Sequence, residues 1–133
     1  MKRTTAEWVR KAEADLVAAR QLTAAKPRVN DPICFHCQQA IEKYLKALLQ
    51  ELRVPIPRIH DLDDILDLLI PRDSTLQRLR RGLNLLTQYA VEYRYPGMTA
   101  NSRQANSAIR LAENVRKEIR IRLGIRERRR KRP

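Results

Sequence analysis

Apolar residues in this chain recur in alternating steps of three and four positions, and this spacing constrains the fold more than any other feature of the sequence. The clearest stripe is Ile33, Cys37, Ala40, Ile41, Tyr44, Leu45, Leu48 and Leu52. Residues at this spacing lie on one face of an α-helix, which makes a turn every ~3.6 residues. The 133-residue chain also has only three glycines and one phenylalanine, and its abundant leucine and alanine favour helix over strand. We therefore predict an all-α fold.

Prolines and short polar residues divide this pattern into five predicted helices. They span residues 4–23, 31–52, 62–70, 74–93 and 102–123. Thr4 and Glu7 have the spacing of a capping box, in which two side chains bond free amides at a helix start. Asp31 is the predicted cap of the second helix, and Asp73 or Ser74 that of the fourth. Five helices with short connections predict one all-α bundle.

Positive charge is concentrated at the C-terminal end, because residues 116–133 carry +8 of the net charge of +13. We expect a helical domain over residues 1–123 and a basic, disordered tail over 124–133. Such a tail either attracts phosphates, as in an RNA-binding module, or is a solvated terminus that keeps the protein in solution. No apolar run approaches the ~20 residues that cross a bilayer, and the N-terminus lacks a signal-type apolar stretch. We therefore expect a cytoplasmic protein that makes no membrane contact.

The two cysteines, Cys34 and Cys37, have three candidate roles: a redox pair, metal ligands, or core packing. Cys34 falls in the first turn of a predicted helix, where the helix dipole can lower a thiol pKa. A thioredoxin-like motif, however, needs a βαβ context, and a zinc site needs about four ligands. The chain adds only His36 and His60. Because Cys37 lies on the apolar stripe, we predict that the thiols pack and that neither a metal nor a cofactor is bound.

A polar stripe follows the other side of the same predicted helix. Its members are His36, Gln39, Lys43, Lys46 and Gln50. Glu42 can pair with Lys46, and Gln38 with Glu42, across one helical turn. The stripe is either an ordinary solvated face or a row of hydrogen-bond donors that faces a cleft and suits a phosphate or nucleotide.

Three segments, in this order, resemble the HEPN domain (higher eukaryotes and prokaryotes nucleotide-binding). They are "FHCQQAIEKYLKALL" at 35–49, "IHDLDDILDLL" at 59–69 and "EYRYPG" at 92–97. The first and last predicted helices also match in kind, so that the resemblance spans roughly residues 5–123. It implies a four- to five-helix up-and-down bundle that commonly forms homodimers and is frequently paired with a small, separate nucleotidyltransferase, often in toxin–antitoxin modules.

The resemblance also implies an alternative activity, because many HEPN proteins are ribonucleases with an Arg-x(4–6)-His motif. In that motif Arg supports the phosphate and His acts as acid and base at the ribose 2′-hydroxyl. Arg53 and His60 have the right spacing here, but Pro55 and Pro57 between them predict a loop rather than a helix end. At the more equivalent place, Arg94 has no histidine after it. We expect His60 to cap or pack the third helix beside Asp61.

The leading hypothesis is therefore a non-catalytic, nucleotide-binding HEPN protein that works with a nucleotidyltransferase. Lys43 and Arg94 are the predicted phosphate contacts, His36 and Gln39 the hydrogen-bonding groups, and Tyr95 a stacking or packing surface. A ribonuclease toxin that uses Arg53 and His60, and an RNA-binding module that uses the basic tail, remain the alternatives.

Overall fold

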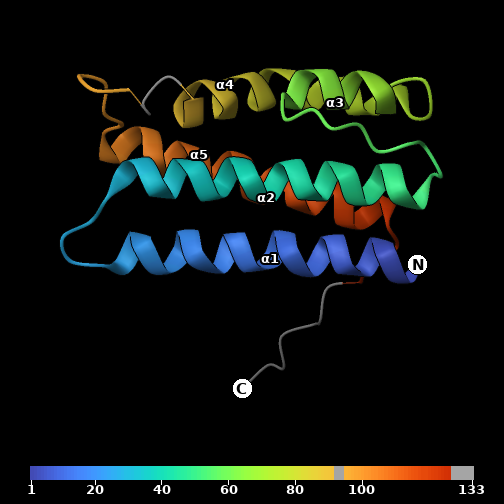
Figure 1. Ribbon diagram of the computed structural model, residues 1–133, viewed down its shortest axis with the longest axis horizontal. Helices are drawn as coiled ribbons and strands as arrows, with labels where there is room; N and C mark the ends of the chain where they lie inside the picture. The colour runs from blue at the N-terminus through green and yellow to red at the C-terminus, as the bar shows by residue number, and fades with distance from the viewer. Residues whose placement is uncertain (92–94, 127–133) are drawn as a thin grey trace.

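Six helical segments account for most of the chain in a computed structural model, which describes residues 1–91 and 95–126 (Figure 1). They are α1 (Arg3–Ala24), α2 (Asn30–Glu51), α3 (Leu62–Leu69), the 3-10 helix η1 (Ser74–Leu79), α4 (Arg80–Val91) and α5 (Ser102–Arg122). The described residues contain no strand. The predicted all-α fold is confirmed, and the predicted tail lies, from residue 127 onward, outside the described residues.

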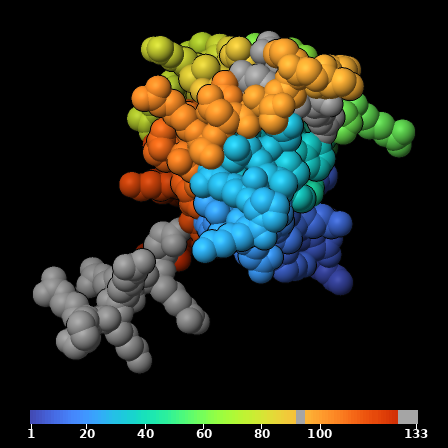
Figure 2. All heavy atoms as spheres, turned by 90° about the vertical axis from the view of Figure 1, so that its left-hand side faces the viewer, coloured from blue at the N-terminus to red at the C-terminus, as the bar shows by residue number. Residues whose placement is uncertain are grey.

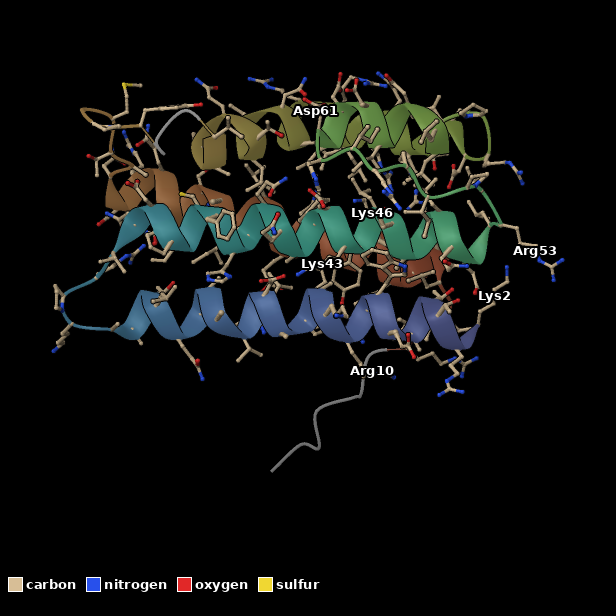
Figure 3. All side chains as sticks on the ribbon, viewed as in Figure 1. Lys2, Arg10, Lys43, Lys46, Arg53 and Asp61 are labelled. Carbon is tan, nitrogen blue, oxygen red and sulfur yellow. The ribbon has the colours of Figure 1, made fainter. Side chains whose placement is uncertain are left out.

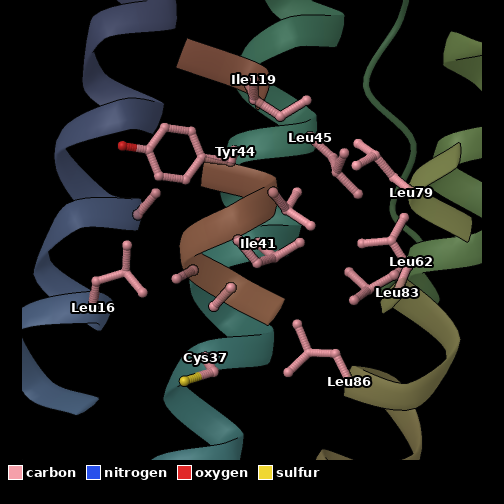
Figure 4. Close-up of a cluster of buried hydrophobic side chains, with 14 of the residues drawn as sticks. Leu16, Cys37, Ile41, Tyr44, Leu45, Leu62, Leu79, Leu83, Leu86 and Ile119 are labelled. Atoms are coloured by element: carbon pink, nitrogen blue, oxygen red, sulfur yellow. The ribbon is translucent and has the colours of Figure 1, made fainter. Parts of the chain in front are cut away.

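Helix α2 is the centre of the bundle. In Figure 1 it lies between α1 on one side and α3 and α4 on the other, with α5 behind it. It packs against all four of these helices, and 13 of its 22 residues are buried. Figure 4 shows that Cys37, Ile41 and Leu45 of α2 face side chains from several helices, among them Leu16 of α1 and Leu83 of α4. The predicted apolar stripe is therefore the core of the protein.

The helix starts at residues 3 and 30 are stabilised differently from the sequence prediction. Helix α1 begins at Arg3, before Thr4. The amide of Lys2, the residue just before the helix, donates to Glu51 Oε1 of α2 at 2.9 Å. Helix α2 begins without a side-chain cap, and Asp31 Oδ1 instead accepts from the amide of Ala100 at 2.7 Å. The predicted capping box at Thr4 and the predicted cap at Asp31 are therefore wrong: Glu51 is the acceptor at the first helix start, and the Ala100 amide engages the carboxylate that was expected to cap the second.

The later helix starts are capped locally. Asp61 accepts from the amide of Asp64, and Asp73 accepts from the amide of Thr75, both at 3.0 Å. Asn101 opens α5 with a capping box that the sequence analysis had not identified. The predicted fourth helix is divided, because a 3-10 turn over Ser74–Leu79 precedes α4.

The two cysteines are completely buried and not joined by a disulfide. Burial raises the pKa of the Cys34 thiol to about 11, and the charge of Asp31 adds to this effect. Burial also raises the pKa of Cys37 to about 12. The helix start therefore does not activate Cys34, and the prediction that the thiols pack in the core is confirmed.

A polar cluster ties α1, α2 and α5 together at the edge of this core. The Tyr44 hydroxyl donates to Glu13 Oε1, which also accepts from Arg116 Nε at 2.7 Å and from Arg120 Nη1 at 3.1 Å. Burial alone would raise the pKa of Glu13, but the hydrogen bonds from Tyr44 and Arg116 and the charges of Arg116 and Arg120 hold it below its ordinary value.

No helix among the described residues is long and apolar enough to cross a membrane.

Buried thiols with raised pKa values should resist alkylation. At about pH 8, iodoacetamide should label the folded protein far more slowly than the urea-unfolded chain, because the thiolate is the reactive form. The double change Cys34→Ala and Cys37→Ala should leave the helical circular dichroism spectrum intact and lower the free energy of unfolding by ~1 kcal/mol or somewhat more. Labelling of the folded protein at the unfolded rate would contradict this burial.

The Glu13 cluster should make stability fall in acid. Because the folded-state pKa of Glu13 is lowered, its contribution is fully present above the unfolded pKa and is lost as pH falls through and below about 4.5. Glu13→Gln should remove about 1–2 kcal/mol near neutral pH and flatten this acid dependence in urea titrations. Glu7→Gln, at an exposed residue of the same helix, is the matched control. An equal effect of both changes would disprove a special role for Glu13.

Candidate functional site: a cleft between α2 and α4

The predicted polar stripe of α2 divides between two sides of the helix. His36 and Lys43 both turn toward α1, where His36 Nδ1 lies 3.0 Å from Asp15 Oδ1 and Lys43 Nζ donates to the other oxygen of the same carboxylate. About a quarter of each of these two side chains remains exposed. A phosphate that bound to Lys43 would therefore compete with Asp15 for the ammonium group.

The other side of the stripe forms a buried cluster around Glu42, whose side chain is 8% exposed. Its Oε2 lies 3.2 Å from Lys46 Nζ and 3.1 Å from His60 Nδ1. Gln38 Nε2 bridges Glu42 Oε1, at 3.5 Å, and the carbonyl of His60, at 3.3 Å. Both predicted pairs, Glu42 with Lys46 and Gln38 with Glu42, are confirmed. A buried carboxylate needs such partners, because an isolated charge loses its hydration on burial.

Lys46 is the most buried cation of this cluster, with 7% of its side chain exposed. Its ammonium group also lies 6.0 Å from the ring centre of Trp8 on α1, at the outer limit of a cation–π contact. Figure 3 labels Lys43 and Lys46, one turn apart on α2. Of the positive groups that the sequence placed on this stripe, Lys43 and Lys46 each already have a carboxylate partner.

A cleft of about 480 Å³ lies beside the Glu42 cluster, between α2, the loop before α3 and the end of α4. Its walls are Phe35, Gln38, Gln39, Glu42, His60, Asp61, Thr87, Ala90 and Val91. Thr87 Oγ1 is buried in this wall and has no hydrogen-bond partner among the described residues. A buried hydroxyl without a partner costs free energy. The Thr87 hydroxyl is therefore an unsatisfied polar group just beneath the cleft surface, whereas Gln39 belongs to the lining itself.

The cleft wall contains polar groups and carries a small negative charge. The negative charge of Glu42 is matched by Lys46, and Asp61 caps α3. The Gln39 amide can donate and accept hydrogen bonds, and Gln38, whose nitrogen is already engaged, keeps its side-chain oxygen as an acceptor; such groups can match the edge of a nucleobase. The His60 side chain is 79% exposed, and Glu42 orients its ring through Nδ1.

The structure places the other predicted residues as follows. Gln39 lines the cleft, whereas Tyr95 is 68% exposed and is not part of its wall. Arg94 lies outside the described residues. Arg53 follows the end of α2 with a positive φ of 58°, and Figure 3 shows it at that end of the bundle, well away from Asp61.

Arg53 and His60 are not brought together by the fold. His60 contacts Glu42, nine residues before the last residue of α2, which corresponds to about 13 Å along the helix axis. Arg53 lies two residues further on. The Arg-x(6)-His spacing in the sequence therefore spans a loop that returns along α2 and separates the two side chains.

Phe35, Thr87, Ala90 and Val91 are cleft residues that the sequence analysis did not single out. Phe35 lies one position from His36, inside the segment that carried the family resemblance, so a signal was present. Thr87 has no such signal, because only the packing of α4 against α2 shows that its hydroxyl lacks a partner. Among the described residues, no three His, Cys, Asp or Glu side chains gather in a way that could hold a metal ion.

Comparison with known proteins agrees with this architecture. The model of the HEPN domain family matches residues 5–122. The crystal structure of an archaeal HEPN homologue superposes with a TM-score of 0.74 at 24% sequence identity, over 92% of this chain and 99% of that one. The crystal structure of a protein from Thermus thermophilus gives a TM-score of 0.72 at 23% identity, over 90% and 98% of the two chains. Likeness at this level of identity concerns the fold. No curated protein gives a significant match.

Proposed function

This chain belongs to the HEPN domain family, and from that premise we propose that it is a non-catalytic protein that binds a nucleotide in the cleft between α2 and α4. A separate nucleotidyltransferase performs the chemistry, in a pair of the toxin–antitoxin type. The HEPN protein itself is a homodimer. The observation that carries this proposal is the cleft of about 480 Å³, with the Gln39 amide and the Phe35 ring in its wall.

The composition of the cleft supports a nucleoside as the bound group. Phe35 provides an aromatic edge, Gln39 provides a donor and an acceptor, and Gln38 provides an acceptor. The sequence predicts that Arg94 holds the phosphates, and this remains part of the proposal.

Exposed apolar side chains at the end of α4 support the dimer. Val91 is 45% exposed, Met98 46% and Tyr95 68%. Exposed apolar groups that lie near one another are typical of contact surfaces between proteins. Val91 also lines the cleft, so a second copy bound here would approach the nucleotide.

A nucleotide should bind measurably, and loss of a cleft amide should weaken the binding. We expect Gln39→Ala to raise the Kd of a nucleoside triphosphate ~5- to 10-fold, because one hydrogen bond contributes about 1 kcal/mol. Calorimetric titration with ATP, GTP, CTP and UTP would measure the change. Gln50→Ala is the control, since Gln50 lies on the same helix but lines the groove beside α1.

The Arg94→Ala variant tests the phosphate contact in the same titration. A Kd for the triphosphate that rises much more than that of the nucleoside supports the contact. If no nucleotide binds to the wild-type protein, or if the Gln39 and Gln50 variants lose affinity equally, the cleft is not the site.

A ribonuclease is the second candidate, and one observation favours it: Glu42 orients the exposed His60 ring through Nδ1. A carboxylate that orients an imidazole is one half of an acid–base site. The arginine of the predicted pair is distant, however, so we expect no metal-independent RNA cleavage by the purified protein. The decisive assay compares wild type with His60→Ala on labelled RNA. Cleavage that this single change abolishes would replace the binding function with the ribonuclease.

A further inference from the structure

The outer surfaces of α4 and α5 carry two rows of exposed polar side chains that the nucleotide cleft does not use. The η1–α4 row consists of Gln77, Arg81, Asn84 and Gln88. The α5 row consists of Arg103, Arg110, Asn114 and Lys117. Figure 2 shows the two neighbouring surfaces at its upper left, in yellow-green and orange. Each row follows steps of three, four or seven residues, so that its members share one helix face.

Four of these side chains are cations without a carboxylate partner. Arg81, Arg103, Arg110 and Lys117 make no ion pair or hydrogen bond with any described residue, and all four are exposed. The acidic residues of α5, in contrast, are already engaged: Glu113 pairs with Arg20, and Glu118 with Arg78 and Arg122. No acidic residue occurs in α4. The surface is therefore positive, with no free carboxylate among its described residues to oppose an anion.

A shallow groove runs between the two rows. It has a volume of about 410 Å³ and is lined by Arg78, Leu79, Arg81, Gly82, Leu85, Leu111, Asn114 and Val115. The helices approach closely at Gly82, where an added Cβ would lie 3.1 Å from Leu111 Cδ2. The axes of two packed helices such as α4 and α5 lie about 8–10 Å apart. Along α5, successive cations are about 10 Å apart, in the order Arg103, Arg110 and Lys117. The cations are thus held on two rigid supports rather than on loops.

We propose that this surface binds the phosphate backbone of a nucleic-acid duplex. Arg81 and the α5 cations contact phosphates on the two sides of the groove, and Asn84, Gln88 and Asn114 donate further hydrogen bonds to phosphate oxygens. Arginine, lysine and side-chain amides are the groups that make such contacts in general. The site is distinct from the nucleotide cleft, which lies on the side of α4 that faces α2.

The side chains of the two rows favour a duplex over a single strand or a protein. A platform for single-stranded nucleic acid stacks bases on aromatic rings, and neither row contains one. A protein partner usually needs buried aromatic or apolar anchors at the centre of its contact, whereas Leu85 and Leu111 are largely covered. Cations and amides held on rigid helices suit the regularly spaced phosphates of a duplex. They would not distinguish one base sequence from another.

The test is duplex binding by the full chain. Fluorescence anisotropy would use a labelled 20-base-pair DNA duplex, the RNA duplex of the same sequence and the DNA single strand. We expect the two duplexes to bind within a few-fold of each other, because the contacts go to phosphates, and the single strand to bind more weakly. Arg81→Gln with Arg110→Gln should raise the duplex Kd at least ~10-fold near 100 mM salt and reduce the salt slope by about two phosphate contacts.

The matched control is Arg10→Gln with Arg58→Gln, which removes two exposed cations from α1 and from the loop before α3. It lowers the net charge equally but should change the duplex Kd by less than ~3-fold. Circular dichroism melting checks that both variants fold. Equal loss in the two variants, or no loss in either, would show that net charge or the C-terminal residues attract nucleic acid. Tighter binding of the single strand, or of a 20-residue glutamate peptide, would overturn the duplex assignment.

Discussion

Helix α2 is surrounded by four other helices, so its sequence has to present a buried surface in nearly every direction. Its 13 buried residues include apolar side chains that face α1, α3, α4 and α5. Burial of apolar surface stabilises by about 25 cal/mol per Å², and most of that surface in this bundle is shared with α2. The positions of the other helices follow from it, because each one covers a different side of the same helix.

The same burial requires partners for every polar side chain that α2 carries inward. Glu42 is satisfied by Lys46, Gln38 and His60, and this set of contacts fixes the loop before α3 against α2. Tyr44 is satisfied by Glu13 and Arg120 on the opposite side. The walls of the cleft are thus held by interactions that also stabilise the fold. On α4, in contrast, the Thr87 hydroxyl is buried in the cleft wall and has no partner among the described residues.

Periodicity was enough to place the helices, because the apolar stripes of α2 and α5 have a single interpretation at 3.6 residues per turn. Local capping was less reliable: Asp73 caps as expected, but Thr4 and Asp31 do not. Glu51, remote in sequence, accepts from the Lys2 amide at the start of α1, and the Asp31 carboxylate accepts from the remote amide of Ala100 instead of capping α2. The candidate site was harder to predict from the sequence, because a polar stripe on one helix does not show which neighbouring helix or side chain it faces. Only the packed structure shows that Asp15 engages His36 and Lys43, leaving Gln39 in the cleft.

Helix α4 carries two different chemistries on two faces. Thr87, Ala90 and Val91 face the cleft, where the wall carries a small negative charge, while Arg81 and Gln88 lie on the outer surface, where positive charge is unopposed among the described residues. Because these residues occupy different sides of one rigid helix, a nucleotide in the cleft and a duplex on the outer surface do not compete for the same atoms. Any coupling between them would have to pass through a shift of α4 itself, and Gly82 limits such a shift, since α4 is already in close contact with Leu111 of α5 there. The two sites are therefore expected to bind independently.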